Sequence, residues 1–155
     1  NRKPKVVLTW APHIKPIAQA VGNSFTEWMQ QMDVDFVITN PEGYDLDKKF
    51  TKDTPVIHNQ DEALKDADFV YVKNWSSFDD YAAMPKVEGE WMLTNEKLEN
   101  THQAKVMHCL PVRRNLELSD EVMDGDHSII YQQAKNRIFS AQTVFSDILD
   151  NLNKD

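Results

Sequence analysis

Short apolar runs alternate along this chain with longer stretches of helical period, and this alternation constrains the fold more than any other feature of the sequence. Each run ends at residues that are typical of turns. The runs are Lys5–Trp10, Phe36–Thr39, Val56–His58, Phe69–Val72 and Ala104–Val106. Strands separated by helices of this length form a parallel sheet that is covered by helices on both faces.

The helices are predicted from the spacing of apolar residues and from residues that favour helix ends. The first runs from Pro16, whose missing N–H suits a first turn, to Met32. The others are predicted at Asp45–Phe50, Gln60–Ala67, Thr94–Glu99, after the N-cap Ser119, and from about Asn136 to Leu152. Ser76–Glu90 is predicted to be a loop at the ligand edge and Ser128–Tyr131 a last short strand. The predicted class is an α/β fold, a Rossmann-like three-layer sandwich with a mostly parallel central sheet.

Composition narrows the class of protein. The chain has 155 residues, of which 41% are hydrophobic, and this predicts one folded domain with a substantial core. A formal net charge of −8 and the lack of a basic face argue against a nucleic-acid partner. A single cysteine excludes an internal disulfide, and no apolar run approaches the roughly 20 residues of a membrane helix. No signal-peptide pattern is visible, so we expect a cytoplasmic protein with no membrane partner.

Two common uses of such a sheet lack their sequence signals. Dinucleotide-binding domains carry Gly-x-Gly-x-x-Gly after the first strand, whereas this chain has only four glycines and no such motif. His58, His102 and His127 are scattered, with no cysteine or acid at ligand spacing. We therefore expect no nucleotide cofactor and no metal.

The segment Met107–Asn115 is the most informative stretch of the chain. It leaves a predicted strand, is turned by a proline and presents Arg113 and Arg114, which suit recognition of a carboxylate or a phosphate. Ligands of open α/β sheets bind outside the carboxyl ends of the strands, where Lys73 and His13 also fall. The segment is therefore a candidate anion site. The alternatives are solvated surface positions for the arginines and a turn position for His13.

Cys109 has two interpretations. As a nucleophile it would lie beside His108, with arginines that favour a thiolate. As a structural residue it would be a small apolar side chain at a strand end. Adjacent residues of a strand point to opposite faces, so His108 is poorly placed as its base and cysteine-protease chemistry is disfavoured. Arg137, expected near the start of the last helix, could point at a ligand or pair with a surface acid.

Several motifs together resemble one known family. His108–Asn115 resembles the signature of the ornithine carbamoyltransferase family, in the form carried by its N-acylornithine branch. The other matching segments are Thr9–His13, Asn23–Phe25, Val72–Trp75 and Gln133–Arg137. They follow the family's order and spacing from one end of the chain to the other, so the resemblance covers essentially all of it.

The resemblance implies transfer of the carbamoyl group of carbamoyl phosphate to the δ-amine of an acylated ornithine, in arginine biosynthesis. It implies that the backbone carbonyls of Cys109 and Leu110 hold the carbamoyl NH₂ and that the Cys109 sulfur lies near the incoming amine. Both are therefore candidate catalytic residues, and Arg137 joins them as a ligand of carbamoyl phosphate. The residues expected to bind the acylated ornithine are His13, Lys73 and Arg113. Fixed positive donors stabilise the charge that develops, and no cofactor or covalent intermediate is needed.

Two departures from the usual family pattern refine this prediction. Ordinary ornithine enzymes grip a free α-amine with an Asp and a Ser-Met-Gly loop, whereas this chain has Lys73–Ser77, whose lysine repels an ammonium and attracts a carboxylate. The carbamoyl-phosphate motifs Ser-x-Arg-Thr and His-Pro-x-Gln are absent. The resemblance thus implies that residues 1–155 are the ornithine-binding, C-terminal half of a carbamoyltransferase and are inactive alone. The N-terminal carbamoyl-phosphate domain would lie outside this chain, and the full-length protein would be a homotrimer.

The acyl group is predicted from smaller differences. Ala11–His13 and Phe25–Met29 look more like the corresponding segments of enzymes that convert N-succinylornithine to N-succinylcitrulline. Glu117 falls where some acetylornithine enzymes carry a lysine. N-acetylornithine is the alternative substrate. Two other function classes stay open: a non-catalytic binding domain for an anionic amino acid, which would use the same cations without turnover, and a Rossmann-like oxidoreductase, which the missing glycine motif disfavours.

Overall fold

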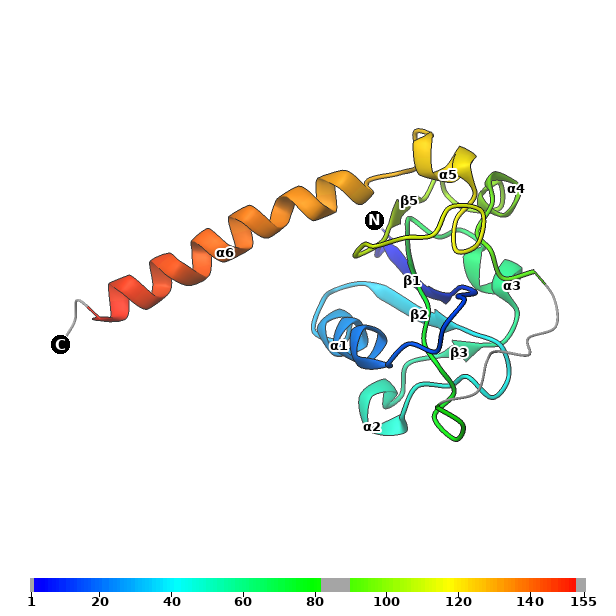
Figure 1. Ribbon diagram of the computed structural model, residues 1–155, viewed down its shortest axis with the longest axis horizontal. Helices are drawn as coiled ribbons and strands as arrows, with labels where there is room; N and C mark the ends of the chain where they lie inside the picture. Colours follow the sequence, from blue (N-terminus) through cyan, green and yellow to red (C-terminus); the bar gives the residue numbers. More distant parts are fainter. Residues whose placement is uncertain (1, 82–89, 153–155) are drawn as a thin grey trace.

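The computed structural model describes residues 2–81 and 90–152 and contains a five-stranded parallel sheet. The strands are β1 (Lys5–Trp10), β2 (Asp35–Thr39), β3 (Val56–Ile57), β4 (Phe69–Lys73) and β5 (Lys105–Met107). Their order is β3-β2-β1-β4-β5, so the chain adds strands on one side of β1 and then crosses over to place β4 on the other (Figure 1). The predicted α/β class is confirmed, and the described sheet is parallel throughout.

Helices cover both faces of the sheet, and alternate strand residues supply the two cores. On one face α1 (Ala20–Met29) packs on Leu8 and Ile38, and α2 (Lys48–Thr51) lies beside α1. On the other face α3 (Gln60–Leu64), α4 (Asn95–Leu98) and α5 (Asp120–Asp124) cover Val7, Val70 and Val106. Because both faces are covered, the strands are continuous apolar runs rather than alternating ones, as the three-layer prediction requires.

The first helix is shorter than predicted, because the residues before it have another role. α1 begins at Ala20, so Pro16 lies outside it. The Ile17 carbonyl accepts the Ser76 N–H at 2.8 Å, and the Gln19 amide donates to the Ser76 carbonyl at 3.0 Å. The segment before α1 therefore holds the loop that follows β4 in place.

Two other predictions about local structure have different outcomes. Ser119 is confirmed as an N-cap, since its hydroxyl accepts the Val122 N–H at 3.3 Å. The predicted loop Ser76–Glu90 has neither helix nor strand at residues 76–81 and 90, and residues 82–89 lie outside the described part of the chain.

The predicted strand Ser128–Tyr131 is wrong. Ser128 makes only an isolated bridge with Val106, and α6 (Ile130–Leu152) begins directly afterwards, well before Asn136. Ile130 is fully buried and anchors the first turn of α6 in the core. A short apolar run is compatible with a strand or with a buried helix start, and periodicity alone does not separate the two.

The helix α6 leaves the body of the molecule as a long rod (Figure 1). Beyond its first turn it presents a row of large apolar side chains, each 51–68% exposed. They are Ile138, Phe139, Val144, Phe145, Ile148, Leu149 and Leu152. Several of these recur three or four residues apart, so α6 has an apolar face that the described residues leave uncovered.

Candidate functional site

The carboxyl ends of β1 and β4 meet where the strand order reverses, and hydrogen bonds join the loops that follow them. The Ala11 N–H donates to the Lys73 carbonyl at 3.2 Å, and the Asn74 amide donates to the Ala11 carbonyl at 2.7 Å. The Trp10 indole N–H donates to the Trp75 carbonyl at 2.7 Å. Such a reversal is where open α/β sheets bind ligands.

Lys73 is the last residue of β4, and only 7% of it is exposed. Within residues 2–81 and 90–152 its ammonium group makes no hydrogen bond or ion pair, although it lies within electrostatic range of the Glu117 carboxylate. A largely buried ammonium is costly unless an opposite charge compensates it. Lys73 is therefore well suited to receive an anionic ligand.

The loop after β5 has an unusual backbone path. Leu110 has a φ of 59°, a left-handed conformation that non-glycine residues rarely adopt, and it precedes a cis peptide bond to Pro111. The Leu110 N–H turns inward and donates to His108 Nδ1 at 3.0 Å. The carbonyls of Cys109 and Leu110 accept no hydrogen bond from any described residue. The loop thus carries two fixed, unused acceptors at the edge where β5 ends.

A buried pair of side chains holds this loop in position. His108 is 0% exposed and Glu117 is 1% exposed, and His108 Nε2 lies 3.3 Å from Glu117 Oε1. Because Nδ1 accepts the Leu110 N–H, the imidazole proton is on Nε2 and donates to Glu117. The other Glu117 oxygen accepts the Arg113 N–H at 2.8 Å. The two ends of the loop are therefore tied to one carboxylate.

The same contacts set the protonation of Glu117. Burial alone would raise the pKa of Glu117, but hydrogen bonds from His108 and the Arg113 N–H, together with the positive charge of Lys73, hold it below its ordinary value. The carboxyl group is thus ionised at neutral pH. From the sequence, Glu117 is recognisable only as a difference within the family, and this role is not predicted. An acid between Leu116 and Leu118 was the available signal for burial.

Cys109 lies on the other side of the loop from His108. It is half-buried and packs with Tyr71 in the core beneath α1. Burial raises the pKa of the Tyr71 hydroxyl, and the adjacent Cys109 thiol raises it further. Among the described residues there is no hydrogen bond between Cys109 and His108. The arrangement is that of a packed thiol and offers no base for a cysteine nucleophile.

The two adjacent arginines have different surroundings. Arg114 donates to Asp120 at 2.8 Å and to the two oxygens of Asp124 at 2.7 and 2.6 Å, and these carboxylates raise its pKa. Arg113 is exposed at the end of the loop and forms no ion pair in the described ranges of the chain. Arg114 is therefore committed to the protein surface, while Arg113 is available to a ligand.

His13 and Arg137 lie further from the strand ends than Lys73 does. The His13 ring caps a turn, since its Nδ1 accepts the Lys15 N–H at 3.1 Å. Arg137 is exposed on α6, one turn beyond Gln133, and pairs with no acid in the part of the chain that the structure describes. The fold thus gathers Lys73, Cys109 and Leu110 on neighbouring strand ends and leaves these two at the margin.

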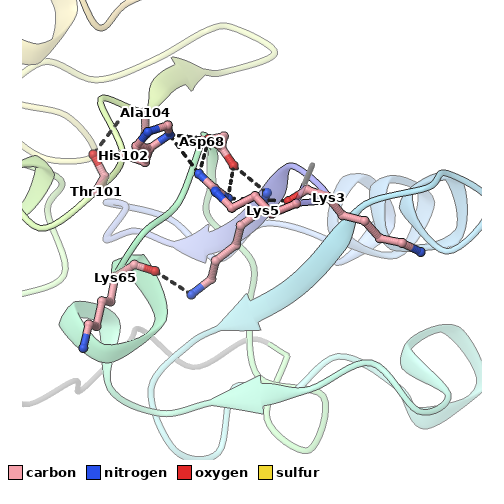
Figure 2. A network of polar contacts seen from close by, with 8 residues as sticks. Lys3, Lys5, Lys65, Asp68, Thr101, His102 and Ala104 are labelled. Carbon is pink, nitrogen blue, oxygen red and sulfur yellow. Dashed lines mark hydrogen bonds and ion pairs between the residues drawn. The ribbon is translucent and has the colours of Figure 1, made fainter.

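A second polar cluster occupies the opposite edge of the sheet, where the strands begin. Figure 2 shows Asp68 facing Lys5 and His102. Asp68 accepts two bonds of 2.7 Å from the Arg2 guanidinium and one of 2.7 Å from the Lys5 N–H, and its Oδ1 lies 2.8 Å from His102 Nδ1. Burial would raise the pKa of Asp68, but these contacts lower it to about 2. The cluster ties the start of the chain to β4 and has its charges largely paired.

No group of three His, Cys, Asp or Glu side chains able to hold a metal ion occurs in the described ranges. No helix among those residues has the length and apolar character needed to cross a membrane.

The topology and the strand-end site define a Rossmann-like ligand-binding domain. The family model for the aspartate/ornithine carbamoyltransferase Asp/Orn binding domain matches residues 17–148. The chain belongs to this family.

Individual relatives agree with this assignment. N-succinylornithine carbamoyltransferases of Bacteroides fragilis (strain 638R) and Bacteroides thetaiotaomicron are 45% and 44% identical over 152 residues, which is 97% of this chain and 48% of each relative. N-acetylornithine carbamoyltransferase of Xylella fastidiosa (strain Temecula1) is 31% identical over 163 residues, covering 94% of this chain and 48% of the relative. The chain spans about half the length of the curated relatives it matches.

Solved structures show the same fold. A crystal structure of N-acetyl-L-ornithine transcarbamylase superposes with a TM-score of 0.82 at 30% identity, covering 88% of this chain and 47% of that one. A structure of acetylornithine transcarbamylase complexed with acetylcitrulline superposes with a TM-score of 0.83, also at 30% identity, and covers 88% of this chain and 46% of that one.

Proposed function

We propose that this chain is the amino-acid-binding half of an N-succinylornithine carbamoyltransferase. The enzyme would transfer the carbamoyl group of carbamoyl phosphate to the δ-amine of N-succinylornithine, giving N-succinylcitrulline in arginine biosynthesis. The proposal is carried by the buried Lys73 ammonium, which lies within electrostatic range of Glu117, the carboxylate that holds the loop whose Cys109 and Leu110 carbonyls accept no hydrogen bond from a described residue. The 44–45% identity to two N-succinylornithine enzymes, against 31% to an N-acetylornithine enzyme, favours the succinyl substrate.

The proposed substrate complements the charges of the site. N-succinylornithine carries two carboxylates and no free α-ammonium, so a site with Lys73, Arg113 and His13 attracts it. Free ornithine would bring an α-ammonium towards Lys73 and be repelled. The guanidinium of Arg113 suits a bidentate contact with a carboxylate, and Lys73 acts as a point charge.

The reaction needs positioned groups rather than a protein nucleophile. The neutral δ-amine attacks the carbonyl carbon of carbamoyl phosphate and forms a C–N bond. The C–O bond to phosphate then breaks, the amine nitrogen loses a proton and phosphate leaves. The carbonyls of Cys109 and Leu110 would hold the carbamoyl NH₂ and so orient the carbon for attack, while Arg137 would also contact carbamoyl phosphate. Orientation and fixed positive charge each lower the barrier of such a transfer.

The proposal includes a second half and an assembly. A carbamoyl-phosphate-binding half preceding these residues would cover the apolar face of α6, since the relatives are about twice as long as this chain. Burying each large side chain of that face would contribute roughly 1.5–3 kcal/mol before ordering costs. A cytoplasmic homotrimer with sites completed by that half is part of the same proposal, and the chain alone would be inactive.

Turnover by the protein with both halves tests the proposal. Carbamoyl phosphate is supplied with N-succinyl-, N-acetyl- or free ornithine, and the ureido product is measured by mass spectrometry. We expect N-succinylcitrulline to form fastest. Faster formation of N-acetylcitrulline would show that N-acetylornithine, and not N-succinylornithine, is the substrate. Calorimetric binding of the acylated ornithine without any product would indicate a non-catalytic binding domain.

A further inference from the structure

Gln133 joins three parts of the site. It lies in the first turn of α6, and its Oε1 accepts the His108 N–H at 2.9 Å. Its side chain also contacts Tyr71 of β4, whose hydroxyl lies beside the Cys109 thiol. One amide group therefore connects α6, the last strands of the sheet and the loop that carries the free carbonyls. Gln133 is the first residue of the sequence motif Gln133–Arg137, and it is not among the residues proposed to contact a substrate.

The attachment of α6 makes this contact important. Among the described residues of α6 only Ile130 is fully buried, and Gln133 and Ala134 are half-buried. An apolar anchor is not directional, so Ile130 fixes the position of the helix better than its rotation. A hydrogen bond has a preferred geometry, and the one from His108 to Gln133 selects a single rotation. Arg137 is four residues later and therefore on the same face of the helix as Gln133.

We propose that Gln133 is a positioning residue that aligns Arg137 on α6 with the Cys109 and Leu110 carbonyls, so that these groups contact one carbamoyl phosphate molecule together. The inference rests on the proposed function. It predicts an effect on one substrate, because the carbonyls and Arg137 serve carbamoyl phosphate, whereas Lys73 and Arg113 serve the acylated ornithine and do not touch Gln133.

The test compares Gln133→Leu with Gln132→Leu in the protein with both halves. Leucine has a volume close to that of glutamine but cannot accept the His108 N–H, and Gln132 is an exposed neighbour in the same helical turn. Loss of one neutral hydrogen bond typically changes an equilibrium about ten-fold. We expect Gln133→Leu to raise the KM for carbamoyl phosphate about ten-fold and the KM for N-succinylornithine less than about two-fold, with Gln132→Leu unchanged.

Hydrogen exchange provides a measure that does not depend on catalysis. Exchange of the amides in residues 107–110, followed by mass spectrometry, should be faster in Gln133→Leu and unchanged in Gln132→Leu. Equal exchange in the two variants, or equal rises in both Michaelis constants, would overturn the inference. Absence of product from the unmodified protein would instead refute the proposed function, so the two failures are distinguishable.

Discussion

Replacing Glu117 by glutamine should destabilise the fold, because both groups that hydrogen-bond to its carboxylate oxygens are donors. The His108 Nε2–H and the Arg113 N–H each point at one carboxylate oxygen. Glutamine has one oxygen, so its amide group must face one of these donors. His108 cannot adapt by moving its proton, since its Nδ1 already accepts the Leu110 N–H.

The expected size follows from these contacts. A hydrogen bond to a charged group typically contributes about 1.5–3 kcal/mol, and a buried donor left unpaired costs about 1–3 kcal/mol. Part of this is offset because the buried negative charge is removed. We expect a net loss of about 2 kcal/mol, which lowers the Tm of a domain of this size by roughly 4–8 °C. Glu121→Gln, the same chemical change at an exposed position in α5, should stay within about 0.5 kcal/mol.

The pH dependence separates this mechanism from simple loss of packing. Folding lowers the pKa of Glu117 from the ordinary value of 4.5, so its ionised form contributes stability that is complete well above pH 4.5 and is lost as the pH falls. The difference in unfolding free energy between the parent and Glu117→Gln, measured in urea, should therefore be large at pH 7 and shrink towards pH 3. A Glu117→Gln protein as stable as the parent, or a difference independent of pH, would refute the reasoning.

Three further predictions address other residues. Asp68→Asn should lower stability at neutral pH. Because contacts hold the pKa of Asp68 at about 2, this deficit should shrink as the pH falls from about 4 towards 2, and an unchanged deficit at pH 2 in urea unfolding would contradict this. Arg113→Ala should lower kcat/KM of the protein with both halves about 100-fold while Tm changes little, because Arg113 is exposed. Arg114→Ala should mainly lower Tm, because it removes the bonds of Arg114 to Asp120 and Asp124. Near-normal kinetics for Arg113→Ala would remove Arg113 from the site. Lys73→Met should raise the KM for N-succinylornithine more than ten-fold and leave the KM for carbamoyl phosphate nearly unchanged; equal effects on both would contradict the assigned role.

Much of the fold follows from local sequence pattern. Lys5–Trp10 and Phe69–Val72 are buried on both faces, so their apolar runs are long enough to be recognised as strands. The carboxyl ends of parallel strands share one edge, and this places Lys73 near Ala11 without knowledge of any contact. By contrast, Ser128–Tyr131 is a short apolar run that fits either a strand or the start of a helix. Which of the two forms depends on how Ile130 reaches the core.

The detail of the site depends on contacts between residues that no periodicity relates. The left-handed backbone of Leu110 turns its N–H towards His108, and only then can a carboxylate nine positions from His108 close the loop. The separate roles of Arg113 and Arg114 also follow from the path of the loop, since the sequence shows only two adjacent arginines. The contact of Gln133 with the His108 N–H requires the rotation of α6, which no sequence pattern specifies.

A crystal structure of the protein with both halves, bound to N-succinylcitrulline, tests the central claim most directly. We predict that the product lies at the carboxyl ends of β1, β4 and β5, with a carboxylate at Lys73 and the ureido NH₂ at the Cys109 and Leu110 carbonyls. Product bound instead at the opposite edge, in the hollow of about 580 Å³ bordered by Arg2, Lys65 and His102, would contradict it.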